Sequence, residues 1–316
     1  MAIGVDLGGS KMLAGVVDER QRVLHQSKEV SLGLTEEEVL DALAGELVEA
    51  RTARPGVAAA GLGIPCTIDQ ERGVAITAVN LPLVDVPIRE QMRERVGMPV
   101  FIDNDVNVAA LAEHRFGAAK GTRNAVMVAI GTGIGGGLIL GGKLYRGTVG
   151  AAAELGHMVV DLDGPRCQGN CPSRGCIEAI ASGTALSREG RAAAERAPAS
   201  AIGRALAEGH ELDGKAITDA AAAGDEVARE VVALIGRRLG VAFASLANIF
   251  EPEVIVVGGG VMAAGELLLE PAREELLARA LPPMSRTPVV AAQLGPRAGM
   301  IGAATMALIE LGKLEG

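Results

Sequence analysis

The sequence repeats one local pattern, in which a short apolar run turns on glycine into a second β-like run. The first copy spans residues 2–18 and turns at Gly8-Gly9-Ser10. The second copy spans residues 125–140 and turns within the glycine-rich segment 131–137. A strand, a glycine turn and a strand form a β-hairpin. The repeat therefore predicts an internal duplication, with each copy built on one glycine hairpin.

The remaining apolar segments alternate between helical and strand-like patterns, which indicates an α/β protein. Thr35 and Glu38 have the spacing of a capping box, so a helix is expected to begin there. The expected helices are residues 35–53, 87–96, 104–116 and 300–311, with a largely helical region over residues 182–250. The further expected strands are residues 57–64, 99–103 and 253–257.

The glycines of the second hairpin match the dinucleotide-binding fingerprint in spacing, at Gly131, Gly133 and Gly136. That fingerprint requires a helix directly after the glycines. Here the apolar run 138–140 and a second glycine pair follow instead. The spacing therefore does not indicate a Rossmann site, and since the P-loop lysine motif is absent too, nucleotide phosphates would have to bind at the glycine hairpins.

Composition argues against nucleic acid as a partner. Aromatic residues make up only 2% of the 316 residues, so bases have few side chains on which to stack. The net charge is −9, which disfavours binding to a phosphate backbone.

No segment is expected to cross a membrane. The longest apolar stretch, residues 231–250, contains Arg237-Arg238 and is typical of a buried helix. The amino-terminal residues enter the first strand pattern at once, without the features of a secretory leader. We therefore expect the chain in the reducing cytoplasm.

Three of the four cysteines lie within ten residues of one another, shortly after a histidine. The four residues are His157, Cys167, Cys171 and Cys176. Three thiolates and one imidazole form a four-ligand set of the kind that zinc prefers in structural sites. Glu154 and Glu178 flank this segment and lie outside the metal set.

Two plainer interpretations of these cysteines are weaker. The cysteines are unlike buried apolar core residues, because polar residues such as Gln168 and Arg174 surround them. Disulfides are disfavoured because three is an odd number and the chain is expected in a reducing compartment. The segment therefore predicts a zinc site.

Asp6 ends the first strand beside a Gly-Gly-Ser-Lys turn. Backbone N–H groups of such a turn can hold phosphates, and a carboxylate there can hold Mg²⁺ directly or through water. The alternative is that Asp6 merely caps the turn. The second glycine turn, with Thr132 and Gly133, favours the phosphate interpretation because two hairpins can hold two phosphates.

Asp103-Asn104-Asp105 ends a strand and opens a helix. One of the three is expected to be the N-cap of that helix. A single cap does not need three polar residues, so we expect a spare carboxylate to face a cleft. Phosphoryl transfer to an alcohol uses such a carboxylate to accept the hydroxyl proton.

Five motifs occur in an order that resembles the ROK family (repressors, open reading frames and sugar kinases), especially its bacterial glucokinases. The resemblance extends from Ile3 to the last expected helix. The motifs are Asp6-Leu-Gly-Gly-Ser-Lys11, Asp103-Asn-Asp-Val-Asn107, the glycine segment 131–137, Glu154-Leu-Gly-His157 and the cysteine segment that closes with Gly175-Cys-Ile-Glu178.

The resemblance implies an α/β fold of the actin-like (ribonuclease H-like) ATPase type, with two α/β domains around a cleft. The smaller domain is expected to comprise residues 1–118 and 300–316, with the first phosphate hairpin and the catalytic aspartate. The larger domain is expected to comprise residues 119–299, with the second hairpin, the zinc segment and an adenosine-side turn. The resemblance also implies a homo-oligomer, either a dimer or a tetramer.

The resemblance further implies a role for each candidate residue. Asp105 is the implied general base for the sugar 6-hydroxyl. The implied sugar-binding residues are Asn104, Asp105, Glu154, His157 and Glu178, and Asn80 is a further candidate for which a turn role is an equal alternative. The implied residues for ATP and Mg²⁺ are Asp6, Gly8, Gly9, Ser10, Lys11, Thr132, Gly133, Gly258, Gly259 and Gly260. The implied zinc ligands are His157, Cys167, Cys171 and Cys176.

The sequence departs from the family pattern in the cysteine segment. One residue commonly separates the first two cysteines of the family, whereas Gln168-Gly169-Asn170 separates them here. The number of ligands is unchanged, but the shape of the segment, and with it the substrate preference, is less certain. Cys66 is interpreted as a packed core residue and not as a ligand.

The function expected from these features is ATP-dependent phosphorylation of a hexose, with glucose as the first candidate. The alternatives are kinases for N-acetylmannosamine, N-acetylglucosamine, fructose or mannose, use of polyphosphate in place of ATP, and a non-catalytic sugar sensor or repressor of the same family. Only Met1 and Ala2 precede the first strand, and the net charge is negative, so a DNA-binding repressor is disfavoured. No residue decides among the hexoses.

Overall fold

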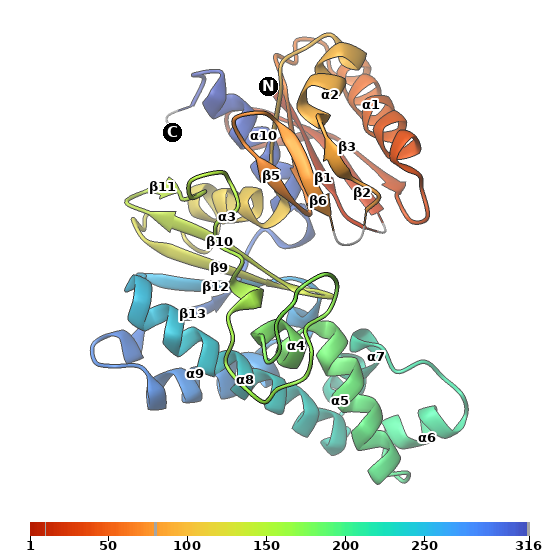
Figure 1. Ribbon diagram of the computed structural model, residues 1–316, viewed down its shortest axis with the longest axis vertical. Helices are drawn as coiled ribbons and strands as arrows, with labels where there is room; N and C mark the ends of the chain where they lie inside the picture. Colours follow the sequence, from red (N-terminus) through yellow and green to blue (C-terminus); the bar gives the residue numbers. More distant parts are fainter. Residues whose placement is uncertain (10, 79–80, 315–316) are drawn as a thin grey trace. The chain divides into compact units, whose positions relative to one another are not determined.

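The computed structural model of the protein describes residues 1–9, 11–78 and 81–314. Contacts group the chain into two compact units (Figure 1). The first unit comprises Met1–Arg123, Gly137–Ala153 and Gln293–Gly316, and the second comprises Asn124–Gly136 and Glu154–Ala292. This grouping places residues 137–153 in the first unit. The predicted division, with residues 1–118 and 300–316 in one domain and 119–299 in the other, placed them in the second. That division stays a prediction.

The first unit contains a five-stranded sheet in the order β3-β2-β1-β4-β8. The predicted hairpin is confirmed, because β1 pairs with β2 in antiparallel register from Ala2↔Val17 to Leu7↔Met12. The strand bounds are β1 (Ala2–Leu7), β2 (Lys11–Val17), β3 (Val23–Val30), β4 (Ala60–Ile64) and β8 (Val100–Asn104). Strands β4 and β8 run parallel to β1, so the carboxyl ends of these three strands lie at the same edge.

A second, three-stranded sheet of this unit was not expected from the sequence. Its strands are β5 (Cys66–Asp69), β6 (Val74–Ala78) and β7 (Val84–Val86), joined in antiparallel order. Strand β3 was also not expected.

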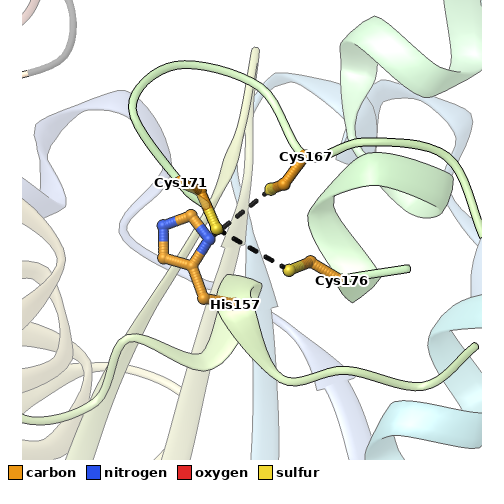
Figure 2. A group of neighbouring side chains, drawn as sticks. All are labelled: His157, Cys167, Cys171 and Cys176. Atoms are coloured by element: carbon orange, nitrogen blue, oxygen red, sulfur yellow. Dashed lines mark hydrogen bonds between the residues drawn. The ribbon is translucent and has the colours of Figure 1, made fainter. Parts of the chain in front are cut away.

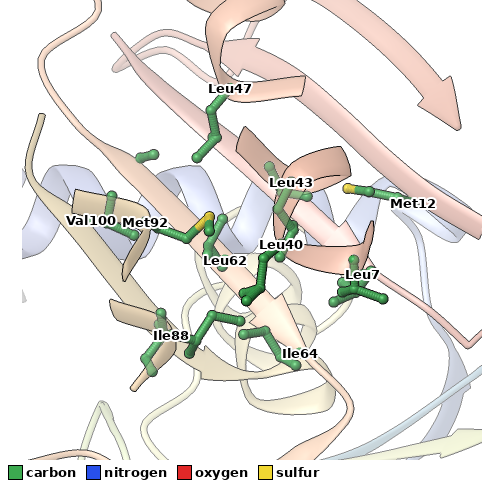
Figure 3. Close-up of a cluster of buried hydrophobic side chains, with 14 of the residues drawn as sticks. Leu7, Met12, Leu40, Leu43, Leu47, Leu62, Ile64, Ile88, Met92 and Val100 are labelled. Atoms are coloured by element: carbon green, nitrogen blue, oxygen red, sulfur yellow. The ribbon is translucent and has the colours of Figure 1, made fainter. Parts of the chain in front are cut away.

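Helices α1 (Glu36–Ala53) and α2 (Ile88–Val96) cover one face of the five-stranded sheet. Figure 3 shows leucines of α1 and Met92 of α2 in one apolar cluster with Leu62 and Ile64 of β4. The predicted capping box of α1 is confirmed, since the Thr35 amide donates to the Glu38 carboxylate at 2.7 Å and the Glu38 amide donates to Thr35 Oγ1 at 3.4 Å.

Helix α10 (Ala298–Glu310) packs against the opposite face of the same sheet, together with α3 (Asp105–Phe116). Side chains alternate between the two faces of a strand, so Ile3 and Val5 of β1 contact the α1 cluster while Gly4 faces α10. A Cβ atom at Gly4 would collide with the backbone of Met300 and Ala304. Glycine at this position therefore lets α10 lie directly on the strand.

The other five-stranded sheet has the order β11-β10-β9-β12-β13. The predicted second hairpin corresponds to β9 (Ala125–Ile130) and β10 (Ile134–Leu140), so a strand follows the glycines, as the argument against a Rossmann site requires. The other strands are β11 (Lys143–Leu144), β12 (Val254–Gly258) and β13 (Val289–Ala291). Strand β12 lies between β9 and β13 and is parallel to both.

The second unit contains six α-helices in the part of the chain that the structure describes. They are α4 (Ile177–Ala181), α5 (Gly183–Arg196), α6 (Ala201–Ala207), α7 (Gly214–Ala222), α8 (Glu226–Phe250) and α9 (Glu266–Arg279). Helix α8 is long and apolar enough to span a membrane by composition alone, but 56% of its most apolar stretch is buried. It packs against α9 and α5, in agreement with the predicted buried helix. Short 3₁₀ turns are η1 (Leu155–His157), η2 (Gly260–Ala264), η3 (Met284–Arg286) and η4 (Gly295–Arg297).

Candidate functional site

The second unit brings the four predicted metal ligands together. One ligand atom from each of His157, Cys167, Cys171 and Cys176 lies within 4.8 Å of all the others (Figure 2). The Cys167 Sγ atom is 3.6 Å from His157 Nδ1, and the Cys171 and Cys176 Sγ atoms are 3.9 Å apart. A compact set of three sulfur atoms and one imidazole nitrogen fits a tetrahedral zinc ion.

The backbone of the cysteine segment holds these side chains in place. Val159 bridges to Cys176, and the Cys167 amide donates to the carbonyl of Ser173 at 3.0 Å. Gly175 has a φ of +62°, and a Cβ atom there would collide with the backbone of Asp161. Glycine is therefore required where the segment turns back toward the last cysteine.

Glu178 connects the cysteine segment to the second glycine turn. Its Oε2 atom accepts a hydrogen bond from the Ile134 amide at 2.8 Å, and its Oε1 atom lies 3.6 Å from Cys167 Sγ. Glu154, just before η1, has a pKa raised by desolvation and by the charge of Glu178, while His157 lowers it. Both predicted sugar-binding acids thus lie in the same unit as the metal ligands.

The second glycine turn is fixed by hydrogen bonds to its own unit. The Gly131 amide donates to Gly133 O at 2.9 Å, and the Gly183 amide donates to Gly131 O at 2.8 Å. The Thr132 carbonyl accepts from Thr184 Oγ1 at 2.9 Å. The turn is therefore held on its carbonyl side by the start of α5.

The predicted adenosine-side glycines, Gly258 to Gly260, lie where β12 ends and η2 begins. Gly259 has a φ of +91°, and a Cβ atom there would collide with the backbone of Ile130. This glycine therefore allows the end of β12 to approach the end of β9.

The first unit holds the first predicted phosphate turn. The Gly8 amide donates to Lys11 O at 2.9 Å, and Ser31 Oγ donates to Gly8 O at 2.7 Å. Gly9 follows Gly8 and Lys11 begins β2, whereas Ser10 is outside the described residues, as is Asn80.

Burial raises the pKa of Asp6 to about 7; the charge of Asp105 also raises it, and Lys11 lowers it. A Cβ atom at Gly299, in the first turn of α10, would run into the Asp6 carboxylate. Asp6 is therefore an acid whose charge the folded chain tolerates poorly without a cation.

We predict that Asp6→Asn makes the protein more stable than the wild type at pH 8, in the absence of nucleotide and Mg²⁺. Since the folded pKa is raised, the folded state holds more protons than the unfolded state between about pH 4 and pH 7, and the wild type loses stability as the pH rises through that window. The advantage of Asp6→Asn should grow by more than ~1 kcal/mol between pH 4.5 and pH 8 in urea unfolding. Asp85→Asn, an exposed control in the same unit, should show no such growth; an equal change in both variants would contradict the prediction.

The Asp103-Asn104-Asp105 segment lies between β8 and α3, and its three residues have three different roles. Asn104 is the N-cap of α3, since its Oδ1 atom accepts hydrogen bonds from the amides of Val106 at 2.9 Å and Asn107 at 3.3 Å. The expectation that one of the three is a cap is therefore confirmed. Asn104 Nδ2 lies 3.4 Å from the carbonyl of Cys66, a residue that packs in the apolar core.

Asp103 is fully buried and is paired with Arg146 and Asn107. Its Oδ2 atom accepts from Arg146 Nε at 2.6 Å, and its Oδ1 atom accepts from Asn107 Nδ2 at 2.9 Å. Asp105 is the first residue of α3 and is partly exposed. The sequence reasoning missed Arg146 and Asn107, which hold the segment from which Asp105 projects.

We predict that Arg146→Ala lowers the free energy of unfolding by about 2–4 kcal/mol, because it leaves the Asp103 carboxylate buried without its cation. Urea unfolding at pH 7 measures this loss. Arg93 forms an exposed pair with Glu90 at 3.6 Å, so Arg93→Ala is the matched control, with a loss of about 0–1 kcal/mol. Equal losses in the two variants would show that the buried pair does not stabilise the fold.

Comparisons with known proteins agree with the predicted family resemblance. The sequence matches the ROK family over residues 2–310. It is 40% identical to a glucokinase of Streptomyces coelicolor over 314 residues, covering 97% of each chain. It is 36% identical to a glucokinase of Thermotoga maritima, covering 96% of each chain.

The fold agrees with solved structures of this family. A ROK family glucokinase from Streptomyces griseus, solved in complex with glucose and AMPPNP, is 39% identical, with a TM-score of 0.87 over 97% of this chain and 98% of that one. A ROK hexokinase from Thermus thermophilus is 37% identical, with a TM-score of 0.78 over 99% of each chain. The α/β architecture is thus the expected actin-like ATPase fold, and the chain belongs to the ROK family.

Proposed function

We propose that the protein transfers the γ-phosphoryl group of ATP to the 6-hydroxyl of a hexose, and that glucose is the preferred acceptor. The observation that carries the proposal is the division of roles at the start of α3. Asp103 is buried against Arg146 and Asn104 caps the helix, whereas Asp105 is partly exposed at the first position of α3, close enough to Asp6 for its charge to raise the pKa of that acid. The names of the relatives, bacterial glucokinases at 36–40% identity, support glucose as the acceptor, and the Streptomyces griseus relative solved with glucose and AMPPNP supports ATP as the donor.

In this mechanism Asp105 accepts the proton of the attacking hydroxyl as its oxygen approaches the phosphorus atom. General-base catalysis contributes roughly 10²–10⁴-fold to the rate of such a step. The Asn104 side chain, Glu154, His157 and Glu178 are proposed to orient the sugar by hydrogen bonds to its other hydroxyls. Orientation matters because a well-positioned acceptor needs little further loss of motional freedom to react.

The phosphates of ATP are proposed to bind at the two glycine turns, through Thr132 and through backbone N–H groups other than those of Gly8 and Gly131, which bond within their own turns. Asp6, with Lys11 of the same hairpin, is proposed to hold Mg²⁺ directly or through water. Bound Mg²⁺ neutralises charge that develops on the transferred phosphoryl group. The raised pKa of Asp6 fits this role, because a cation would restore a favourable environment for its carboxylate.

Zinc is proposed to bind His157, Cys167, Cys171 and Cys176 and to act structurally. A structural zinc ion stiffens the segment that carries it and contributes folding free energy. His157 is proposed to face the sugar with its second ring nitrogen, so that the metal fixes the orientation of a substrate-binding side chain.

The test is an assay of ADP release over a panel of hexoses, with ATP and with polyphosphate as donors. We expect the highest kcat/KM with glucose and ATP. A higher kcat/KM for N-acetylmannosamine, N-acetylglucosamine, fructose or mannose would replace glucose as the acceptor, and turnover with polyphosphate alone would replace ATP as the donor. No turnover of any hexose would overturn the kinase proposal in favour of a sugar sensor.

A cytoplasmic location and a homo-oligomer, either a dimer or a tetramer, remain part of the proposal. Sedimentation of the purified protein would separate a monomer from these two assemblies.

A further inference from the structure

The cysteine segment contains an extension whose side chain contacts the second glycine turn. Gln168 lies in the lengthened Gln168-Gly169-Asn170 spacing between the first two cysteines. Its Nε2 atom donates a hydrogen bond to the carbonyl of Thr132 at 3.1 Å. This bond links the residue next to a proposed zinc ligand to the centre of the proposed phosphate turn.

The geometry around Gly133 shows how closely the two segments fit together. A Cβ atom at Gly133 would collide with the Glu178 carboxylate and would lie 3.4 Å from Gln168 Nε2. Glu178 also accepts a hydrogen bond from the Ile134 amide at 2.8 Å. Two side chains of the cysteine region therefore hold the glycine turn on one side, one through a carbonyl and the other through an amide.

The carbonyl of Thr132 accepts hydrogen bonds from two different segments of the unit. It accepts a hydrogen bond from Gln168 Nε2 of the cysteine segment at 3.1 Å, and from α5 it accepts one from Thr184 Oγ1 at 2.9 Å and a longer one from the Thr184 amide at 3.4 Å. When both lone pairs of this carbonyl are engaged, the peptide plane between Thr132 and Gly133 has a fixed orientation. The orientation of that plane decides where the Gly133 N–H group points, and N–H groups of such turns bind phosphate.

We propose that Gln168 is a positioning residue for the phosphoryl donor: it fixes the Thr132–Gly133 peptide so that the Gly133 N–H group points toward the phosphates of ATP. This inference rests on the proposed function, in which the second glycine turn binds phosphate. It gives the longer cysteine spacing of this chain a role on the nucleotide side, in addition to any effect on the sugar.

The test compares Gln168→Ala and Gln168→Glu with Asn170→Ala. Gln168→Ala removes the donor, and Gln168→Glu keeps the size of the side chain but places a carboxylate against the Thr132 carbonyl. Asn170 lies two residues away, is exposed, and has no side-chain hydrogen bond within the described part of the chain, so Asn170→Ala is the matched control. For each variant, AMPPNP binding is measured by calorimetry, KM for ATP and for glucose by assay, and zinc content by mass spectrometry.

Gln168→Ala is expected to weaken AMPPNP binding and to raise KM for ATP about 3–10-fold, as for the loss of one hydrogen bond. Gln168→Glu is expected to weaken both further, while Asn170→Ala leaves both unchanged. KM for glucose, zinc content and thermal stability should stay at wild-type values. Unchanged AMPPNP affinity in both Gln168 variants would overturn the proposal, and so would a parallel loss of zinc and of glucose affinity, because that result indicates a general role in folding the segment.

Failure of the Gln168 proposal and failure of the proposed function would give different experimental results. Because AMPPNP binding is measured directly, the role of Gln168 is tested even if the preferred sugar is not glucose. If wild-type protein binds no AMPPNP, the kinase proposal itself fails, and this failure is seen before any variant is compared.

Discussion

Replacing Asp105 with asparagine is expected to lower kcat by about 10²–10⁴-fold while sugar binding is kept. Asparagine has the size of aspartate and can still form hydrogen bonds to a hydroxyl, but it cannot accept the proton that the attacking oxygen loses. Asp105 is the first residue of α3, whose N-cap is Asn104, so the substitution leaves the cap in place. Turnover by coupled assay and glucose affinity by calorimetry measure the two effects separately.

Asp85→Asn is the matched control, since Asp85 is an exposed aspartate of the same unit. It should change neither kcat nor glucose affinity. Near-normal turnover in Asp105→Asn would remove Asp105 from the mechanism. Loss of both turnover and sugar binding, with wild-type thermal stability, would instead assign Asp105 to binding alone.

Replacing Cys176 with alanine is expected to reduce bound zinc from about one ion per chain to almost none, since three ligands do not close a structural site. Cys176 is fully buried and precedes α4, whose second residue is Glu178. Loss of the metal should therefore loosen His157 and Glu178 together. We expect KM for glucose to rise about 10–100-fold, the range seen when supporting groups around a metal are removed.

Cys66→Ala is the control for this experiment, because Cys66 is a buried cysteine of the first unit that packs in its apolar core. The Cys66→Ala variant should have the zinc content and the KM for glucose of the wild type, with only a small loss of stability. Graded chelation of the wild type gives a second measurement: sugar affinity should fall before the fold is lost. Wild-type sugar affinity in zinc-free protein would limit the metal to a role in folding.

Elements with a strong local pattern were predicted well from the sequence. The hairpin of β1 and β2 and the capping box of α1 depend on residues close together in the chain, and both are present in the structure. Strand β3 was missed because most of its side chains are polar and none is buried, so it lacks the apolar run that predicted the other strands. Strands β5 to β7 are only three to five residues long, too short for a clear period.

The partners of the candidate residues could not be predicted for a different reason. Arg146 is 43 residues from Asp103, and Ile134 is 44 residues from Glu178. Sequence spacing gives no information about such pairs, because only the folded sheet brings them together. The segment Asp103-Asn104-Asp105 has more polar residues than a helix cap needs, but only the structure shows that Asp103 is buried against Arg146 and that Asp105 is partly exposed.

The close packing of α10 also bears on the order in which the chain can fold during synthesis. Glycines at positions 4 and 61 let α10 lie on β1 and β4, and at Gly302 the helix lies equally close to Val108 of α3. The first unit therefore completes its core with residues 298–310, which the ribosome makes more than 170 residues after the last strand of that sheet, β8. The second unit contains no residue beyond Ala292, so all of it is synthesised before α10. Its core can therefore form while the first unit still lacks its last helix.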